Sequence, residues 1–201
     1  SGDHRDLHSF PTRRSSYRIV VDATCLERNL NLVLQTLEAT PKVVVCVNLI
    51  DEAERKGIKI DIDKLSKILG VPVAATNATG KIGLERLADY IYELSADKID
   101  VNPLVITYDD EIEKAVAYVE TALTPLTCDR LCVRWTAMRI IEGDDTGEQI
   151  QGLLVDNKGI SDAVDEARAF LEDKGLNVEV LREKTASKII EMCEMISHRI
   201  V

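Results

Sequence analysis

The chain has 201 residues, of which 45% are hydrophobic and 30% charged, and its formal net charge is −10. This is the balance of a globular protein with one large or two modest domains, and the acidic charge argues against nucleic acid or an anionic membrane surface as a main partner. No apolar run approaches the ~18 residues that span a bilayer, and the first residues do not form a secretory signal, so we expect soluble structure. The five cysteines, an odd number, favour a reduced, cytoplasmic setting.

The residues from 17 to about 98 alternate apolar strands with amphipathic helices. The strands are predicted from continuous apolar runs, and the helices from apolar residues spaced three and four apart. The predicted strands cover 17–23, 42–48 and 71–76, and the predicted helices cover 30–39, 61–70 and 83–94. This alternation implies right-handed crossovers, and therefore a parallel sheet in an α/β fold.

From residue 103 onward only helical patterns occur, and they predict an all-α helical bundle domain over 103–201. The bundle should contain about five helices, with Ser161 as the N-terminal cap of the fourth. The predicted helices cover 109–124, 129–143, 147–155, 160–175 and 178–201.

The strand predicted over 42–48 is followed by two residues suited to the recognition of guanine. Asn48 ends the apolar run, and Asp51 follows three residues later. A carboxylate accepts hydrogen bonds from both N1–H and the 2-amino group of guanine, whereas adenine would leave polar groups unpaired at about 1–3 kcal/mol each. We predict that Asp51 has this role and that Asn48 braces the loop at the carboxyl end of the strand, where open α/β sheets bind ligands. A plain turn is the alternative, because Asn-x-x-Asp is a common pattern.

A second loop follows the next predicted strand. Its residues Asn77 and Ala78 stand where GTPases offer a backbone N–H to guanine O6. They are therefore the second half of the predicted base site, and an ordinary strand-to-helix loop is the alternative.

The residues that would bind phosphate and Mg²⁺ are missing from this sequence. The pattern G-x-x-x-x-G-K-[ST] does not occur, and Asp-x-x-Gly occurs only at 144–147 and 156–159, inside the helical region, where we interpret it as chance. Cys128 and Cys132 are one helical turn apart, but no nearby Cys or His completes a ligand set, so we interpret them as helix-face thiols. We predict no catalytic residue and no metal ligand, and hence little or no GTP hydrolysis.

Three stretches of the chain together resemble one family. They read "VVDATCLERNLNLVLQTLE", "VVVCVNLIDEAERKGIKIDIDKLSKILGVPV" and "RWTAMRIIEGD". In order and spacing they are similar to the cytosolic region of FeoB, the prokaryotic ferrous iron transporter with an N-terminal GTP-binding domain. The resemblance runs from about Tyr17 to the end. It implies a partial P-loop GTPase-like sheet over 17–98, followed by the family's helical domain over 103–201.

The resemblance also implies functional roles. Asn48 and Asp51 would read the guanine of GTP or GDP, with Asn77 and Ala78 on its O6 side. Leu49 replaces the base-stacking Lys of other GTPases, which should weaken nucleotide affinity. The intact parent would control Fe²⁺ passage at the cytoplasmic face of the inner membrane, with Mg²⁺ bound to residues absent here. This region would relay nucleotide state to the parent's membrane domain.

The same resemblance implies a chain truncated at both ends. Residues 8–16 read "HSFPTRRSS", which resembles one reading frame of a sequencing adapter, so we expect 1–16 to be non-native. A natural disordered tail is the alternative. Without preceding strands, the strand at 17–23 should be an unpaired, aggregation-prone edge. The alternative for the whole chain is a pseudo-GTPase without a P-loop, acting as an interaction module through its helical bundle.

Overall fold

The computed structural model describes residues 16–125, 132–143 and 157–201. Contacts divide the chain into two compact units. Of the described residues, 16–106 and 186–201 form one, which we name the sheet unit, and 107–185 form the other, the helical unit. The prediction for residues 1–16 concerns a segment of which only Ser16 is described, and it stays a prediction.

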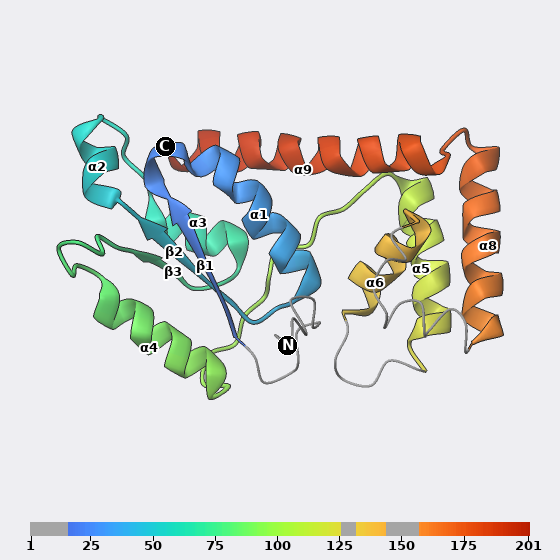
Figure 1. Cartoon of the computed structure of the whole chain (residues 1–201), viewed down its shortest axis with the longest axis horizontal. Coiled ribbons are helices and arrows are strands. Elements are labelled where there is room, and N and C mark those ends of the chain that lie inside the picture. The colour runs from blue at the N-terminus through green and yellow to red at the C-terminus, as the bar shows by residue number, and fades with distance from the viewer. Residues whose placement is uncertain (1–15, 126–131, 144–156) are drawn as a thin grey trace, which may run out of the picture. The chain divides into compact units, whose positions relative to one another are not determined.

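The sheet unit is built on three parallel strands in the order β1-β2-β3, which confirms the predicted α/β fold (Figure 1). The strands are β1 (Tyr17–Asp22), β2 (Val43–Asn48) and β3 (Val73–Ala75). Residues 43–47 of β2 are all buried, because helices cover both faces of the central strand. Among the described residues β1 pairs only with β2, and its Val20 is 62% exposed, as expected for an edge strand.

Helices cover the two faces of this sheet (Figure 1). Right-handed crossovers between successive strands put α1 and α3 on one face, and α4, which follows β3, lies on the other. The apolar stripe of α1 faces the sheet, and Leu30, Val33 and Leu34 are completely buried. The three helices span Leu26–Ala39 (α1), Ile62–Leu69 (α3) and Leu84–Ser95 (α4), so each predicted helix is confirmed.

One short helix, α2 (Ile50–Arg55), was not predicted from the sequence. Apolar periodicity does not predict it, because a six-residue helix is too short to show such periodicity and buries only Ala53. Its stabilising features are local. Asp51 and Glu52 lie in the first turn, where negative charge suits the helix dipole, and each pairs with a basic residue four positions on.

The helical unit contains four of the predicted helices. They are α5 (Asp110–Leu123), α6 (Val133–Ile141), α8 (Lys158–Asp173) and the first turns of α9 (Val178–Ile200). The helix predicted over 147–155 lies outside the described residues, as does Cys128. The predicted Ser161 cap is wrong: α8 begins at Lys158, and the Ser161 N–H donates to the Asn157 carbonyl from inside the first turn.

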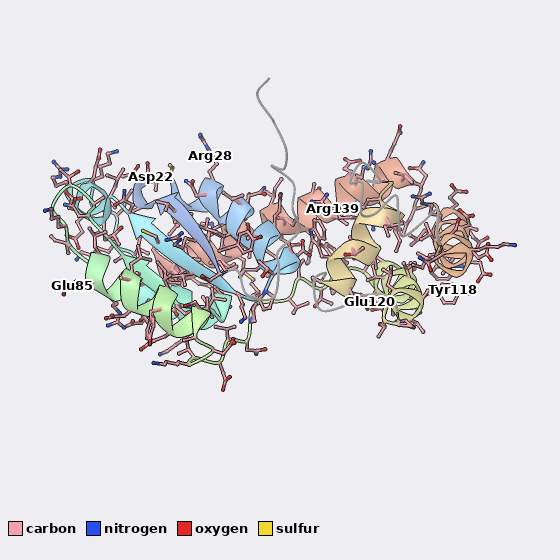
Figure 2. All side chains as sticks on the ribbon, turned by 60° about the horizontal axis from the view of Figure 1, so that its bottom comes forward. Asp22, Arg28, Glu85, Tyr118, Glu120 and Arg139 are labelled. Atoms are coloured by element: carbon pink, nitrogen blue, oxygen red, sulfur yellow. The ribbon has the colours of Figure 1, made fainter. Side chains whose placement is uncertain are left out.

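Polar contacts join the helices of this unit. Tyr118 on α5, labelled in Figure 2, donates its hydroxyl hydrogen to Glu166 on α8. Arginines donate to the carbonyls at the end of α6: Arg168 Nη2 donates to Ile140 O at 2.5 Å, which also accepts from Gly143 N at 3.0 Å, and Arg182 Nε donates to Glu142 O at 2.7 Å. These guanidinium groups also suit the negative end of the α6 dipole.

Helix α9 contributes to both units. Residues 178–185 group with the helical unit and residues 186–200 with the sheet unit. Its buried residues in the sheet unit, Ile189, Cys193, Ile196 and Ile200, recur every three or four positions on one stripe. Burial, together with the nearby Glu27 carboxylate of α1, raises the pKa of the Cys193 thiol to about 11. The predicted domain limits, 17–98 and 103–201, stay a prediction.

Candidate functional site

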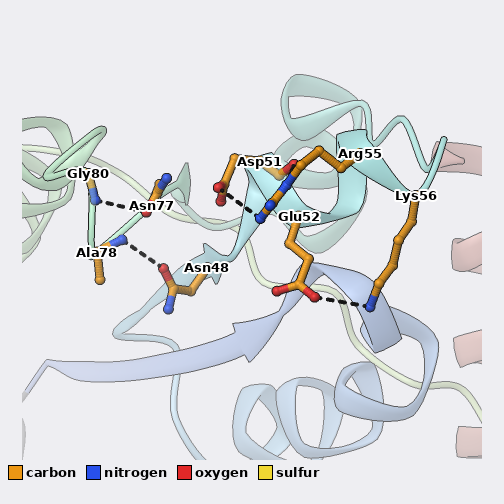
Figure 3. Close-up of polar contacts among 8 residues, drawn as sticks. All are labelled: Asn48, Asp51, Glu52, Arg55, Lys56, Asn77, Ala78 and Gly80. Carbon is orange, nitrogen blue, oxygen red and sulfur yellow. Dashed lines mark hydrogen bonds and ion pairs between the residues drawn. The ribbon is translucent and has the colours of Figure 1, made fainter.

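The candidate site is built on Asn48, the last residue of β2 (Figure 3). Its Oδ1 accepts hydrogen bonds from Thr76 Oγ1 and from the Ala78 backbone N–H, both at 3.1 Å. A backbone N–H can only donate, so the Ala78 contact fixes which end of the amide is oxygen. The Asn48 Nδ2 group makes none of the hydrogen bonds found among the described residues, and it can therefore donate to a ligand.

Thr76 is the residue of this site that the sequence interpretation missed. It is completely buried, and its hydroxyl lies 3.1 Å from both Asn48 Oδ1 and Cys46 Sγ. Its backbone N–H donates to Val47 O at 2.8 Å, and its carbonyl accepts from Ile50 N at 3.3 Å. Thr76 thus joins β2, the start of α2 and the β3–α4 loop (residues 76–83). Thr76, like Asn48, is a polar residue that ends an apolar run, and this was the signal in the sequence that could have identified it.

Asp51 lies in the first turn of α2, at the same carboxyl edge of the sheet as Asn48. Its carboxylate is 43% exposed and forms an ion pair with Arg55, with Oδ2 to Nη2 at 3.5 Å (Figure 3). The helix starts here because Leu49 takes a left-handed conformation, with φ of 62°, which turns the chain sharply after β2. Such a conformation is uncommon for Leu and is typical of functional turns.

The β3–α4 loop is closed by contacts of Asn77. Its backbone pairs with Ile82 in both directions at 3.1 Å, and its Oδ1 accepts from Gly80 N at 2.9 Å. The loop also depends on Gly83, where φ is +76° and a Cβ would lie 2.0 Å from Ala75 O. The structure therefore brings Ala78 and Asn48 into contact, but the Ala78 N–H predicted to face O6 already has a partner in Asn48.

A second carboxylate, Asp22, lies at the same edge, at the end of β1 and opposite Asn48 in the register (Figure 2). Its Oδ1 accepts from Thr24 N at 2.7 Å and caps the short helical turn at Ala23–Cys25. The Thr24 hydrogen bonds hold the pKa of Asp22 below its usual value. Asp22 therefore stays ionised, and its carboxylate serves as the cap of this helical turn.

The arrangement is better suited to binding a flat, polar ring than to catalysing a reaction. Asp51 offers two acceptor oxygens and Asn48 offers two N–H donors, which are complementary to the N1–H and 2-amino donors and the N7 acceptor of guanine. Over the described ranges, no group of three His, Cys, Asp or Glu side chains could hold a metal ion. None of the described helices is long and apolar enough to cross a bilayer.

Two family profiles match the chain in succession. Residues 12–91 match the profile described as "Ferrous iron transport protein B", and residues 108–201 match the one described as "FeoB cytosolic helical domain". Together the two profiles cover both the sheet-forming residues and the helical residues.

Similar proteins give the same result. The "Fe(2+) transport protein A/Fe(2+) transporter FeoB fusion protein" of Porphyromonas gingivalis is 36% identical over 160 residues, which are 75% of this chain and 19% of that protein. The apo cytosolic domain of T. maritima FeoB has a TM-score of 0.69 at 25% identity, covering 92% of this chain and 67% of that one. A GDP-bound NFeoB variant from S. thermophilus has a TM-score of 0.66 at 28% identity, covering 88% and 68%.

The chain spans about a fifth of the length of the curated relatives it matches. Both profiles, the relatives and the structures name the same family. The chain belongs to the FeoB family of ferrous iron transport proteins and carries part of that family's cytosolic G-domain and helical region.

Proposed function

We propose that the edge formed by Asn48, Asp51, Asn77 and Ala78 binds the guanine base of GTP or GDP. Asp51 accepts from N1–H and the 2-amino group, and Asn48 Nδ2 donates to N7. The O6 atom faces the β3–α4 loop, where the Ala78 N–H is shared between O6 and Asn48 Oδ1. The observation that carries this proposal is the orientation of Asn48, whose oxygen is held by Thr76 and Ala78 and whose nitrogen remains a donor.

The comparisons support a guanine nucleotide as the ligand. The S. thermophilus NFeoB structures similar to this chain include the GDP-bound variant named above and another variant bound to GMPPNP. Specificity for guanine over adenine follows from Asp51, because adenine offers no N1–H and would leave the carboxylate without a partner. This chain supplies the base-binding half only, since its sequence lacks a phosphate-binding loop.

For the whole protein we propose a regulatory role for this region. The parent would use GTP, with Mg²⁺ held by residues outside this sequence, to control Fe²⁺ passage through its membrane domain. The region described here would lie at the cytoplasmic face, read the base and relay the nucleotide state. The order of the two profiles along the chain, G domain and then helical domain, supports this arrangement.

The substitution Asp51→Asn tests the base assignment. Xanthine has a 2-oxo group in place of the 2-amino group of guanine, so an amide side chain at position 51 matches xanthine with one acceptor and one donor. We expect the variant to bind xanthosine monophosphate better than GMP. Because each mismatched polar contact costs about 1–3 kcal/mol, the preference should change by roughly 5- to 150-fold. Titrations followed by NMR chemical shifts measure both affinities, even when they are weak.

Asp63→Asn is the matched control. Asp63 is an exposed carboxylate in the first turn of α3, outside the proposed site, and its substitution should leave the preference for GMP unchanged. If Asp51→Asn lowers or preserves the two affinities equally, Asp51 does not read the base.

A further inference from the structure

Among the described residues, strand β1 pairs along one side only, with β2; we name its other side the β1 edge. Tyr17 N donates to Lys42 O at 2.7 Å, so the backbone of Tyr17 faces β2. Because backbone polar groups alternate sides along a strand, those of Arg18, Val20 and Asp22 face the β1 edge. A row of such groups is a template for pairing with another strand.

The side chains of Arg18, Val20 and Asp22 share one face of the sheet, opposite the buried Ile19 and Val21. Val20 is 62% exposed, and the exposed Arg18 forms no ion pair with any described residue. The Asp22 carboxylate caps the helical turn that follows, but a carboxylate has about four acceptor positions and can also pair with a cation. The face therefore carries a cation, an apolar side chain and an anion in that order.

This order is self-complementary when two copies of the strand run antiparallel. With Val20 opposite Val20 of a second copy, Arg18 lies opposite Asp22 of the second copy at both ends of the pairing. Residues directly opposite each other lie on the same face, so each end forms a cross-strand pair of opposite charge. The register also brings together backbone groups that face outward on both strands, as an antiparallel ladder requires. A shift by one residue would lose both matches.

We propose that the β1 edge binds the β1 edge of a second copy of this chain, antiparallel and with a two-fold axis at Val20. The two three-stranded sheets then form one continuous sheet, and the unpaired backbone groups of both copies are satisfied. The contact closes at a dimer, because both copies use the same surface. Pairing of the β1 edge with β3 of another copy, at the opposite side of the sheet, would instead give open polymers.

The competing occupant of the β1 edge is a strand from another part of the longer protein. This chain matches 67% of the T. maritima cytosolic domain, and the remainder of that domain lies outside the match. If such a strand is the occupant, this chain by itself stays monomeric. The charge order along β1 favours the second copy, because the match of Arg18 with Asp22 arises from two copies of the same strand.

Sedimentation equilibrium of the unmodified chain and of Val20→Lys gives the first test. We expect a reversible monomer–dimer equilibrium, and a dissociation constant about tenfold or more higher in Val20→Lys, which places two ammonium groups opposite each other. Val105→Lys is the matched control: Val105 is also 62% exposed, lies outside β1, and its substitution should leave the equilibrium unchanged. A monomer at every concentration, open polymers, or a dimer unaffected by Val20→Lys would overturn the proposal.

A pair of charge reversals tests the register itself. Arg18→Glu places two carboxylates opposite each other at both ends of the pairing, and Asp22→Arg places two guanidinium groups there. We expect each variant alone to dimerise about fivefold or more weakly than the unmodified chain, and the equimolar mixture to form a heterodimer of restored affinity. A mixture that associates no better than its components would contradict the proposal. If Asp22→Arg does not fold without its cap, the Val20→Lys comparison decides.

Discussion

At the scale of single residues, the candidate site depends on one side-chain oxygen. Asn48 Oδ1 accepts from both Thr76 and Ala78, so it fixes the β3–α4 loop against the end of β2 and leaves the amide nitrogen as a donor. Removing one partner of a buried hydrogen bond costs more free energy than the intact bond contributes, because the other polar group is left unpaired. Thr76 is therefore a positioning residue, since it acts on the base through Asn48.

We predict that Thr76→Val weakens GMP binding several-fold and lowers the free energy of unfolding by about 1 kcal/mol, because valine keeps the shape but not the hydroxyl donor. Thr76→Ser, which retains the hydroxyl, should restore most of the affinity. NMR titration with GMP and urea unfolding measure the two effects. A valine variant that loses stability but binds GMP normally would assign Thr76 a structural role only.

The sequence alone indicates Asn48 and Asp51, since Asn48 ends a continuous apolar run and Asp51 follows it three residues later. It could not indicate that Thr76 shares the Asn48 oxygen, because the two residues are 28 positions apart and meet only through the pairing of β2 with β3. The left-handed backbone conformation of Leu49 could not be predicted either, because leucine rarely adopts that conformation.

At the scale of elements, ion pairs join the helices of the helical unit, and the apolar periodicity of the sequence does not predict them. Helices α5 and α6 are linked by Glu113 and Arg134, with both carboxylate oxygens 2.8 Å from guanidinium nitrogens. Tyr108 N donates to the same carboxylate at 2.7 Å. Burial works to raise the pKa of Glu113, but the Arg134 and Tyr108 hydrogen bonds outweigh it and hold the pKa below 4.5.

We predict that Glu113→Gln lowers the free energy of unfolding of the helical unit by about 1–2 kcal/mol at pH 7. The folded pKa is lower than the unfolded one, so the stabilisation is present above the unfolded pKa, near 4.5, and is lost as the pH falls through the folded value. The difference between the variant and the parent chain should therefore shrink in acid.

The fluorescence of Trp135, the single tryptophan and a residue of α6, reports this unfolding in urea. Glu183→Gln, an exposed position on α9, is the control and should change stability little at either pH. A Glu113→Gln effect that is as large at pH 3.5 as at pH 7 would contradict the ionic origin.

At the scale of the whole molecule, one helix belongs to two compact units. The apolar spacing of residues 178–201 predicts the helix correctly, but spacing shows only that a stripe is buried and not what buries it. That spacing does not indicate that the Ile200 carbonyl accepts a hydrogen bond from Asp61 N, 139 positions away in the chain. Contacts this distant in sequence are the part of the fold that local patterns cannot predict.

The account as a whole depends on recognition of guanine by the described edge. The most direct test is an NMR titration of the unmodified chain with GMP and with inosine monophosphate, which lacks only the 2-amino group. We expect GMP to shift the resonances of Asn48, Asp51, Asn77 and Ala78, and inosine monophosphate to bind roughly 10- to 150-fold more weakly, since one hydrogen bond to a carboxylate is lost. Equal affinity for the two nucleotides, or shifts confined to other residues, would contradict the central claim.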